Sequence, residues 1–435
     1  MAVRTERPLA SATARPGPAF LGLLAVLFVI FLGGMAAWGY QLSHGLIVTG
    51  MRDVQIWGLY ITCFMLFVGL SAGGLIVASA GTMFGVRRLA PLAPLAIWTS
   101  LVTVAMAAFL ILPDMGHPER LLNLVFDAHL TSPLVWDVAV IVLYGLLSLV
   151  YLWLHLRPTL AAQGNPLALT RGPLDATARR RNERIVQGLA FVALPVAIAV
   201  HSVTAWIFGL QPSHPYWSTA ILAPLFITSA LVSGLGLLLV VLLLARRAGF
   251  LDLAGDTVSW LAGLLGVFIA ADLFMLFADY LTTMFPGNAT DTQPLQLLLS
   301  GPYAWVLWGE IVLMVVAFAL VFTRQMRERP LIVGTAGALT VLATFLYRLG
   351  MVLAGFRTPL LELAPGVATG QVTATTVSGI PTAAPFAMVS TYAPTWVEYA
   401  VIGGILALWL LLLLVGARWL PLRAYAAQVE DEEGA

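Results

Sequence analysis

Ionisable side chains gather in one short stretch of a chain that has few of them. Residues 111–138 read ILPDMGHPERLLNLVFDAHLTSPLVWDV and join two long apolar runs, although only 10% of all residues are charged. The stretch contains Asp114, His117 and Asp137 together with other charged and His residues. Carboxylates and an imidazole are groups that can give and take protons during a reaction. Alternatively, Asp114 and His117 belong to an ordinary solvated loop.

A second set of ionisable residues lies within later apolar runs. It consists of Asp272, Asp279, Glu310 and Arg348. Asp272 and Asp279 are seven residues apart, which places them on one face of a helix. A guanidinium stays charged, so we expect Arg348 to pair with at least one of these acids. The set predicts a polar cluster that either conducts protons or serves only as structure.

The composition indicates that membrane helices carry both sets. Hydrophobic residues make up 60% of the 435-residue chain, whereas about half is usual for soluble domains. They fall into runs of roughly 20 residues, the length that crosses a bilayer as a helix. We predict an all-α polytopic membrane protein with ten transmembrane helices, at residues 19–40, 57–83, 91–112, 133–156, 185–209, 217–245, 257–284, 302–323, 331–354 and 396–417.

The arginine distribution predicts the orientation. All 22 basic residues are Arg: eighteen lie on the side of the two termini, three lie on the other side, and Arg348 lies within a span. Basic residues favour the cytoplasmic side of a membrane. We therefore expect a multi-pass protein of the bacterial cytoplasmic (inner) membrane with both termini in the cytoplasm. Asp114, Asp137 and most other intramembrane ionisable groups then lie in the outer half.

The start of the span 133–156 determines where Asp137 points. Pro133 suits the first turn of a helix, and Ser132 or Thr131 can cap that turn. Asp137 then lies about one turn inside the membrane and faces the loop that carries Asp114 and His117. We expect Ser132 and Trp136 to belong to the same binding site. At such depth an unpaired carboxylate costs several kcal/mol, so Asp137 is a functional candidate by default.

Two halves of the chain resemble each other. Trp57 and Trp217 each open a segment with a Ser- and Gly-rich patch further along. The first patch contains Gly73, for which helix packing is the ordinary role and ligand contact is the alternative. A repeat of four spans explains the likeness. We predict a tail (1–18), a first span with an outer loop (19–56), a four-helix bundle holding the site (57–209), a second four-helix bundle (217–354), an outer loop (355–395), a last span (396–417) and a tail (418–435).

An outer pocket with carboxylates and a nearby His fits the headgroup of a quinone. Quinone reduction takes up two protons and quinol oxidation releases two, so such a site needs groups that exchange protons with each oxygen. A haem b would need two His that face each other, whereas Pro212 and a turn separate His201 from His214. The single cysteine, Cys63, excludes an iron–sulfur cluster held by Cys residues of this chain.

Several segments, in this order, carry a family resemblance. They are WGLYITCFMLFVGLSAGGLIV, LPDMGHPERL, TSPLVWDV, HSVTAWIFGLQPSHPYWSTAILAPLFITSALVSGLGL and PTWVEYAVIGG, from about Trp57 to Trp409. Together they resemble the NrfD/polysulfide-reductase membrane-subunit family, in its longer ten-span branch. The resemblance implies two four-helix bundles, no haem or iron–sulfur cluster in this chain, and a quinone site near the outer face. It implies a role in that site for Asp137 and for a proton acceptor after the third span, where Asp114 and His117 both remain open.

The same resemblance implies partners. A ferredoxin-like iron–sulfur subunit is expected on the outer face, with a molybdopterin catalytic subunit or a multihaem cytochrome in the complex, besides membrane lipid and without nucleic acid. The chain would exchange electrons between menaquinone or ubiquinone and that partner, with proton translocation left open. Two other classes stay open: a secondary transporter, whose coupling acids usually lie near the midplane, and a purely structural membrane anchor.

Overall fold

The computed structural model describes residues 17–434 except 171, 212, 252–253, 288 and 358–391. Most of the predicted tail 1–18, most of the predicted loop 355–395, and Pro212 therefore lie outside the described residues. The described part is helical, with one isolated β-bridge between Arg52 and Gln55. The prediction of an all-α chain is confirmed.

Ten helices in the described part are long and apolar enough to cross a membrane. They are α1 (Pro18–His44), α2 (Leu59–Met83), α3 (Ala93–Asp114, preceded by the 3-10 turn Arg87–Leu92), α5 (Pro133–Ala162), α6 (Ala176–Gly209), α7 (Leu222–Arg247), α8 (Gly255–Met284), α10 (Ala304–Phe322), α12 (Pro330–Gly355) and α13 (Trp396–Trp419). They match the ten predicted spans one for one. The chain is a multi-pass integral membrane protein.

Local sequence explains several helix starts. Proline occupies the first turn of α1, α5 and α12, where its fixed φ suits a helix and its missing N–H is not needed. Helix α6 begins at Ala176, earlier than the predicted 185. Asp175 caps it there by accepting a hydrogen bond of 2.6 Å from the Ala178 N–H. The apolar pattern ends before the helix does, so hydrophobicity alone placed the start too late.

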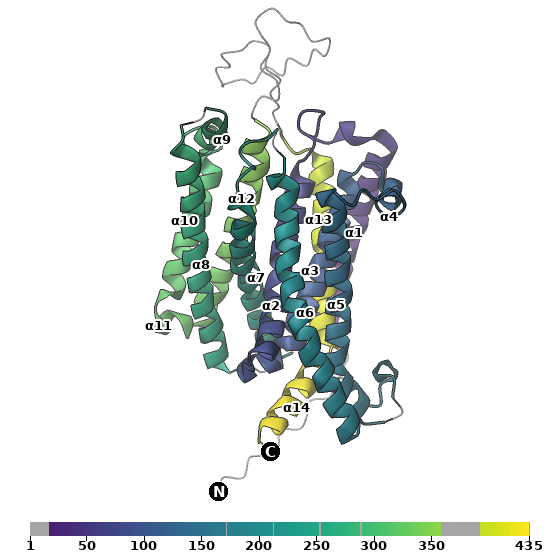
Figure 1. The fold of residues 1–435 in the computed structure, drawn as a ribbon. Coiled ribbons are helices and arrows are strands. Elements are labelled where there is room, and N and C mark those ends of the chain that lie inside the picture. Colours follow the sequence, from purple (N-terminus) through teal and green to yellow (C-terminus); the bar gives the residue numbers. More distant parts are fainter. Residues whose placement is uncertain are drawn as a thin grey trace, which may run out of the picture.

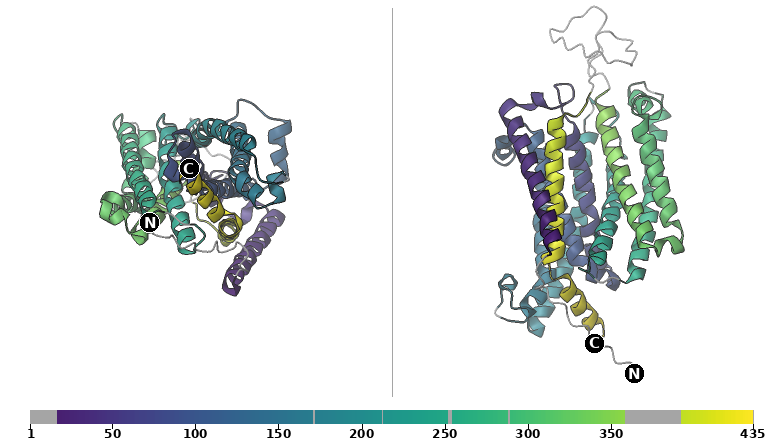
Figure 2. Two further views of the ribbon diagram at one scale, coloured as in Figure 1. Left: turned by 90° about the horizontal axis from the view of Figure 1, so that it is seen from below. Right: turned by 180° about the vertical axis from the view of Figure 1, so that it is seen from behind.

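The long helices run side by side as one bundle (Figure 1). Helices α3, α6 and α7 pack against α2, and α5 packs against α6 and α3. Helices α8 and α12 pack against α7, and α10 packs against α12. The two flanking helices α1 and α13 lie together, as Figure 2 shows from behind, and α13 contacts α3. Because α2 and α7 also pack closely on each other, the division into two four-helix bundles stays a prediction.

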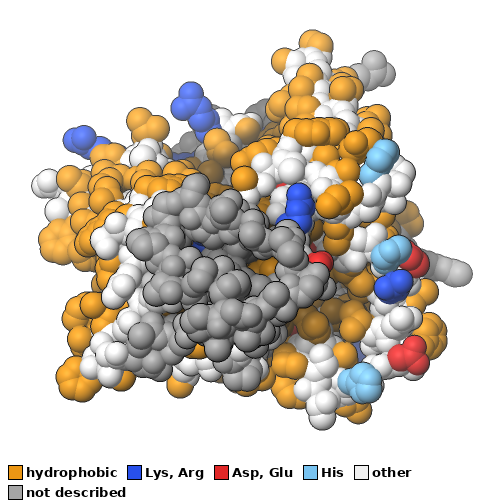
Figure 3. All heavy atoms as spheres, turned by 90° about the horizontal axis from the view of Figure 1, so that it is seen from above, with side chains coloured by type: hydrophobic (Ala, Val, Ile, Leu, Met, Phe, Trp, Pro, Cys, Tyr) orange, Lys and Arg blue, Asp and Glu red, His pale blue; other side chains and the backbone are white. Residues whose placement is uncertain are grey.

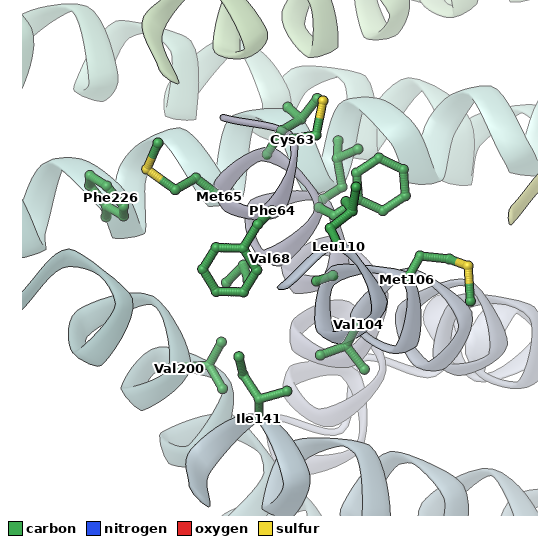
Figure 4. Packing of buried hydrophobic residues seen from close by; sticks show 14 of the residues in the cluster. Cys63, Phe64, Met65, Val68, Val104, Met106, Leu110, Ile141, Val200 and Phe226 are labelled. Carbon is green, nitrogen blue, oxygen red and sulfur yellow. The ribbon is translucent and has the colours of Figure 1, made fainter. Parts of the chain in front are cut away.

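Apolar side chains from several helices meet around α2. Figure 4 shows Ile141 of α5 and Val200 of α6 pointing toward Phe64 and Val68 of α2. These four side chains are almost entirely buried. In a membrane, burial against lipid or protein differs little, so tight packing is what holds such helices together.

Short helices at the two ends were not predicted. They are α4 (Asn123–Phe126), α9 (Ala289–Leu299), α11 (Arg324–Arg327) and α14 (Leu422–Gly434). Each is too short or too polar to give the hydropathy signal of a span. Helix α14 lies below the bundle in Figure 1, at the end where α6 begins. We call that end inner and the opposite end outer, following the predicted orientation.

Gly73 lies where α2 and α7 cross. A Cβ atom built on Gly73 would come within 2.0 Å of the backbone C and O of Gly234, and one on Gly234 would come within 2.3 Å of the Gly73 N. Each glycine is opposite the backbone of the other, a contact only a residue without a side chain permits. Gly73 is absent from the lining of the outer cavity described below. These contacts support the packing role of Gly73 over the alternative of ligand contact.

Replacing Gly73 by Ala is expected to destabilise the protein by about 1–3 kcal/mol, because α2 and α7 must move apart. The measurement is the apparent melting temperature of the detergent-solubilised chain. Gly69→Ala is the matched control on the same helix, since its Cβ would meet Ser233 Oγ at an ordinary 3.4 Å. Equal stability of the two variants would contradict the packing argument.

Candidate functional site

A cavity of about 420 Å³ lies at the outer end of α2, α3, α5 and α6. This volume falls within the usual range of about 300–1,000 Å³ for small-molecule sites. Its wall is mostly apolar and includes Trp57, Ile61, Phe64, Ile111, Leu124, Leu134, Val138, Ile207 and Phe208. Its polar wall consists of Asp114, Arg120, Asn123, Asp127, His129, Ser132 and Asp137. Three predicted site residues, Asp114, Ser132 and Asp137, therefore line one cavity.

Asp137 is the most deeply buried acid of this cavity. Its side chain is 2% exposed, and its Oδ1 accepts a hydrogen bond of 2.6 Å from Thr204 Oγ1 on α6. Thr204 Oγ1 also lies 2.9 Å from the Val200 carbonyl oxygen, and its single proton can serve only one of the two acceptors at a time. No hydrogen bond is found for Asp137 Oδ2 within the described part of the chain. Asp137 thus has a free acceptor atom beside the cavity.

Asp114 is the last residue of α3, and the flanking helix α1 holds its backbone in place. Gln41 Nε2 donates a hydrogen bond of 2.7 Å to the Pro113 carbonyl, and Gln41 Oε1 accepts one of 2.6 Å from Tyr60. The last carbonyls of a helix need such outside donors. Asp114 Oδ1 is buried and has no partner among the described residues. A buried carboxylate oxygen without a donor is costly and invites a ligand that can donate.

The segment between α3 and α5 forms the outer wall. Trp136 Nε1 donates a hydrogen bond of 2.6 Å to the Leu130 carbonyl, which fixes the segment to the first turn of α5. Trp136 itself is 38% exposed and does not line the cavity. Ser132 occupies the N-cap position of α5, but its side chain makes no capping hydrogen bond. Its hydroxyl is therefore not committed to the helix end.

His117 lies apart from the cavity, contrary to expectation. Its side chain is 62% exposed, and its Nδ1 lies 2.8 Å from Glu119 Oε1. The pKa of Glu119 is below its usual value, because the Glu119 carboxylate accepts hydrogen bonds from the Glu119 backbone N–H and from His117. The imidazole expected in the pocket is instead His129, which lines the cavity. The sequence alone gives no signal that distinguishes His129 from His117, because both lie in the polar segment between the two spans.

Viewed from the outer end, His and acidic side chains lie on the right of the molecule together with Lys or Arg side chains, and further Lys or Arg side chains lie at the upper left (Figure 3). The segment that joins α3 to α5 contributes Arg120, Asp127 and His129 to the cavity wall.

The second set of ionisable residues is buried among α7, α8, α10 and α12. Asp272, Asp279, Glu310 and Arg348 are 4%, 7%, 3% and 1% exposed. Thr228 donates a hydrogen bond of 2.8 Å to Asp272 Oδ1, and Thr219 donates one of 2.9 Å to Asp279 Oδ1. Both aspartates therefore accept hydrogen bonds from hydroxyl groups of α7 and of the turn before it.

Arg348 does not form the expected ion pair. Within the described residues it makes no salt bridge; its Nη2 donates a hydrogen bond of 2.6 Å to Ser229 Oγ. Its guanidinium carbon lies 3.6 Å from the centre of the Phe226 ring, a cation–π arrangement. Asp272 and Glu310 are near enough to act on Arg348 electrostatically. The expected direct pair is corrected to a hydroxyl and an aromatic ring.

His201 of α6 was missed as a member of this cluster. It is 1% exposed, its Nε2 has no partner among the described residues, and Arg348 acts on it electrostatically. The polar cluster therefore reaches from the second group of helices into α6, which also carries Thr204. In the described part of the chain, no group of three or more His, Cys, Asp or Glu is placed to hold a metal ion.

Comparison with known proteins places this architecture in a family. Residues 47–359 match the family model of polysulphide reductase, NrfD. A Halobacterium salinarum protein, provisionally named as a membrane subunit of dimethyl sulfoxide reductase, is 41% identical over 97% of this chain and 95% of its own length. A subunit of the selenate reductase of Mesobacillus selenatarsenatis is 26% identical over 77% of this chain and 82% of its own.

A further relative is the Hdr-like menaquinol oxidoreductase integral membrane subunit of Archaeoglobus fulgidus, which is 26% identical over 48% of each chain. The family match covers most of the chain, and the first of these relatives is similar along almost its whole length. The chain belongs to the NrfD polysulphide reductase family of reductase-complex membrane subunits.

Proposed function

We propose that the chain exchanges electrons between a membrane quinone and an iron–sulfur partner subunit on the outer face of a respiratory oxidoreductase complex. The observation that carries this proposal is the outer cavity, which combines an apolar wall with Asp114 and Asp137. Its relatives' names mention a menaquinol oxidoreductase and reductases of dimethyl sulfoxide and selenate. Menaquinone or ubiquinone is the proposed substrate.

The cavity residues divide the work by their chemistry. Trp57, Phe64 and Phe208 provide aromatic and apolar surface for a flat ring. Asp137 Oδ2 and Asp114 Oδ1 provide acceptors for the protons of two hydroxyl groups when a quinol is oxidised, and in their protonated forms they provide donors for the reverse reaction. The two electrons pass to or from the partner, which carries the redox centres.

We propose that this partner is ferredoxin-like and docks over the outer end, with a molybdopterin subunit or a multihaem cytochrome completing the complex. The cavity lies at the outer end of the helices, which supports docking of the partner on that side. We also propose that the buried cluster around Asp272 and Arg348 couples the reaction to proton movement. Its buried acids, its hydroxyl groups and its arginine support this second proposal.

Binding of a water-soluble quinol analogue to the purified complex tests the proposal. We expect the analogue to raise the apparent melting temperature of wild-type protein, since a ligand that binds the native state stabilises it. Phe208→Asp places a charge in the apolar wall and should abolish this rise. A transporter or a structural anchor would show no rise in the wild type, which would overturn the proposal.

The two histidines of the segment between α3 and α5 are expected to differ in their effect on turnover. His129→Ala should lower quinol-linked turnover of the assembled complex by up to about tenfold, the loss of one hydrogen-bonding group in the cavity wall. His117→Ala should leave turnover nearly unchanged, because His117 is exposed and its side chain bonds to Glu119 at the surface. Steady-state rates with equal amounts of assembled complex measure both. The reverse order would restore His117 as the pocket imidazole.

A further inference from the structure

A second cavity, of about 630 Å³, lies at the inner end of the bundle. Helices α2, α5 and α6 form its walls, together with the 3-10 turn before α3, and α14 closes one side. Two hydrogen bonds fix α14 to α5: Thr159 Oγ1 donates one of 2.8 Å to Gln428 Oε1, and His155 Nδ1 shares one of 3.0 Å with Tyr425 Oη. The cavity is therefore built by residues 270 positions apart.

Two buried side chains in its wall have polar atoms without a partner in the described part of the chain. Asn182 is 3% exposed and donates from Nδ2 to the Leu154 carbonyl at 3.0 Å, which leaves its Oδ1 without a donor. His155 is 9% exposed, and its Nε2 likewise has no partner. When Tyr425 donates to Nδ1, Nε2 carries the ring proton and is a donor. Buried polar atoms are rarely left unpaired, so this wall suits a ligand with both a hydrogen-bond acceptor and a hydrogen-bond donor.

Charge selects the kind of ligand. Among the described residues that line the cavity, Arg87 can offer its guanidinium to a ligand, and Glu183 is the acid in the same wall. Arginine suits phosphate because its fork of donors matches the phosphate oxygens. The position at the inner end of the spans is the depth at which lipid headgroups lie. Outside the polar atoms, the wall is apolar, with Val86 and Leu154 among its members.

We propose that this cavity binds the headgroup of an anionic phospholipid that carries a free hydroxyl, such as a phosphatidylglycerol. The phosphate is held by Arg87 and by the His155 imidazole, and the hydroxyl group donates to Asn182 Oδ1. The acyl chains follow the apolar surface toward the membrane. Helix α14 thus gains a role, because it completes a lipid site instead of merely ending the chain.

The experiment uses the full chain in detergent and follows its apparent melting temperature. Three additions are compared: a short-chain phosphatidylglycerol, a phosphatidylcholine with the same acyl chains, and glycerol phosphate without acyl chains. We expect stabilisation by phosphatidylglycerol alone. Arg87→Ala should raise the apparent dissociation constant for phosphatidylglycerol about tenfold, the effect of losing one charge-assisted hydrogen bond.

Arg88→Ala is the matched control, because Arg88 is the neighbouring arginine, does not line the cavity, and lies over the Trp260 ring at 5.6 Å. It should bind phosphatidylglycerol like the wild type. Equal stabilisation by the two lipids would overturn the anionic headgroup. If glycerol phosphate stabilised the protein as much as phosphatidylglycerol does, the cavity would instead be a site for a soluble phosphate compound. Equal weakening by both arginine variants would place the lipid elsewhere on this surface.

Discussion

Asp137→Asn is expected to lower the quinol-linked turnover of the assembled complex by at least about a hundredfold, the usual contribution of a positioned acid or base. The amide has the same shape as the carboxylate and can still accept the hydrogen bond from Thr204. It cannot take up a proton. The fold should therefore survive while proton exchange is lost. Steady-state turnover per assembled complex measures the effect.

Two further variants separate proton exchange from positioning. Thr204→Val removes the hydroxyl that donates a hydrogen bond to Asp137 Oδ1. It should lower quinol-linked turnover by less than about tenfold, the value of one hydrogen bond. Asp137→Glu keeps a proton acceptor and should retain more turnover than Asp137→Asn. Near-normal turnover of an assembled Asp137→Asn complex would reduce Asp137 to a structural residue.

The ten spans were predictable because bilayer thickness fixes the length of an apolar run. Their order also brought Asp114 and Asp137 together, since the end of α3 and the start of α5 are joined by one short segment. What the pattern could not give was the conformation of that segment. Gly116 has a φ of +69°, which turns the chain away from the helix. Pro118 then begins a new turn, so the three-residue spacing of Asp114 and His117 no longer puts them on one face.

Contacts between distant parts of the chain were the second kind of feature that the sequence could not predict. Gln41 lies near the end of the first span, and nothing local indicates that it binds the Pro113 carbonyl 72 positions away. Gly73 was recognised as a small residue with two competing roles. The choice required knowing that Gly234 lies opposite it. Arg348 was correctly placed within a span, but its partners Ser229 and Phe226 come from another helix and could not be predicted from charge alone.

The final prediction concerns Asp272, which we expect to carry protons. Among the described residues, the arginine beside it has no ion pair, and Arg348 instead meets Ser229 and Phe226. A direct ion pair would hold a carboxylate permanently charged. Because Asp272 is held by the Thr228 hydroxyl instead, it can gain or lose a proton without breaking a salt bridge. Arg348 lies near enough to act on Asp272 electrostatically.

Asp272→Asn should therefore abolish the proton gradient of reconstituted vesicles, down to the level seen with a protonophore, while quinol-linked electron transfer continues. A pH-sensitive dye inside the vesicles and the rate of acceptor reduction measure the two quantities together. Thr228→Val, which leaves the carboxylate in place and removes its hydrogen bond, should weaken the gradient less. An unchanged gradient in Asp272→Asn would make the cluster static. Parallel loss of gradient and electron transfer would also exclude a separate proton path, because the cluster would then serve the quinone reaction itself or the assembly of the complex.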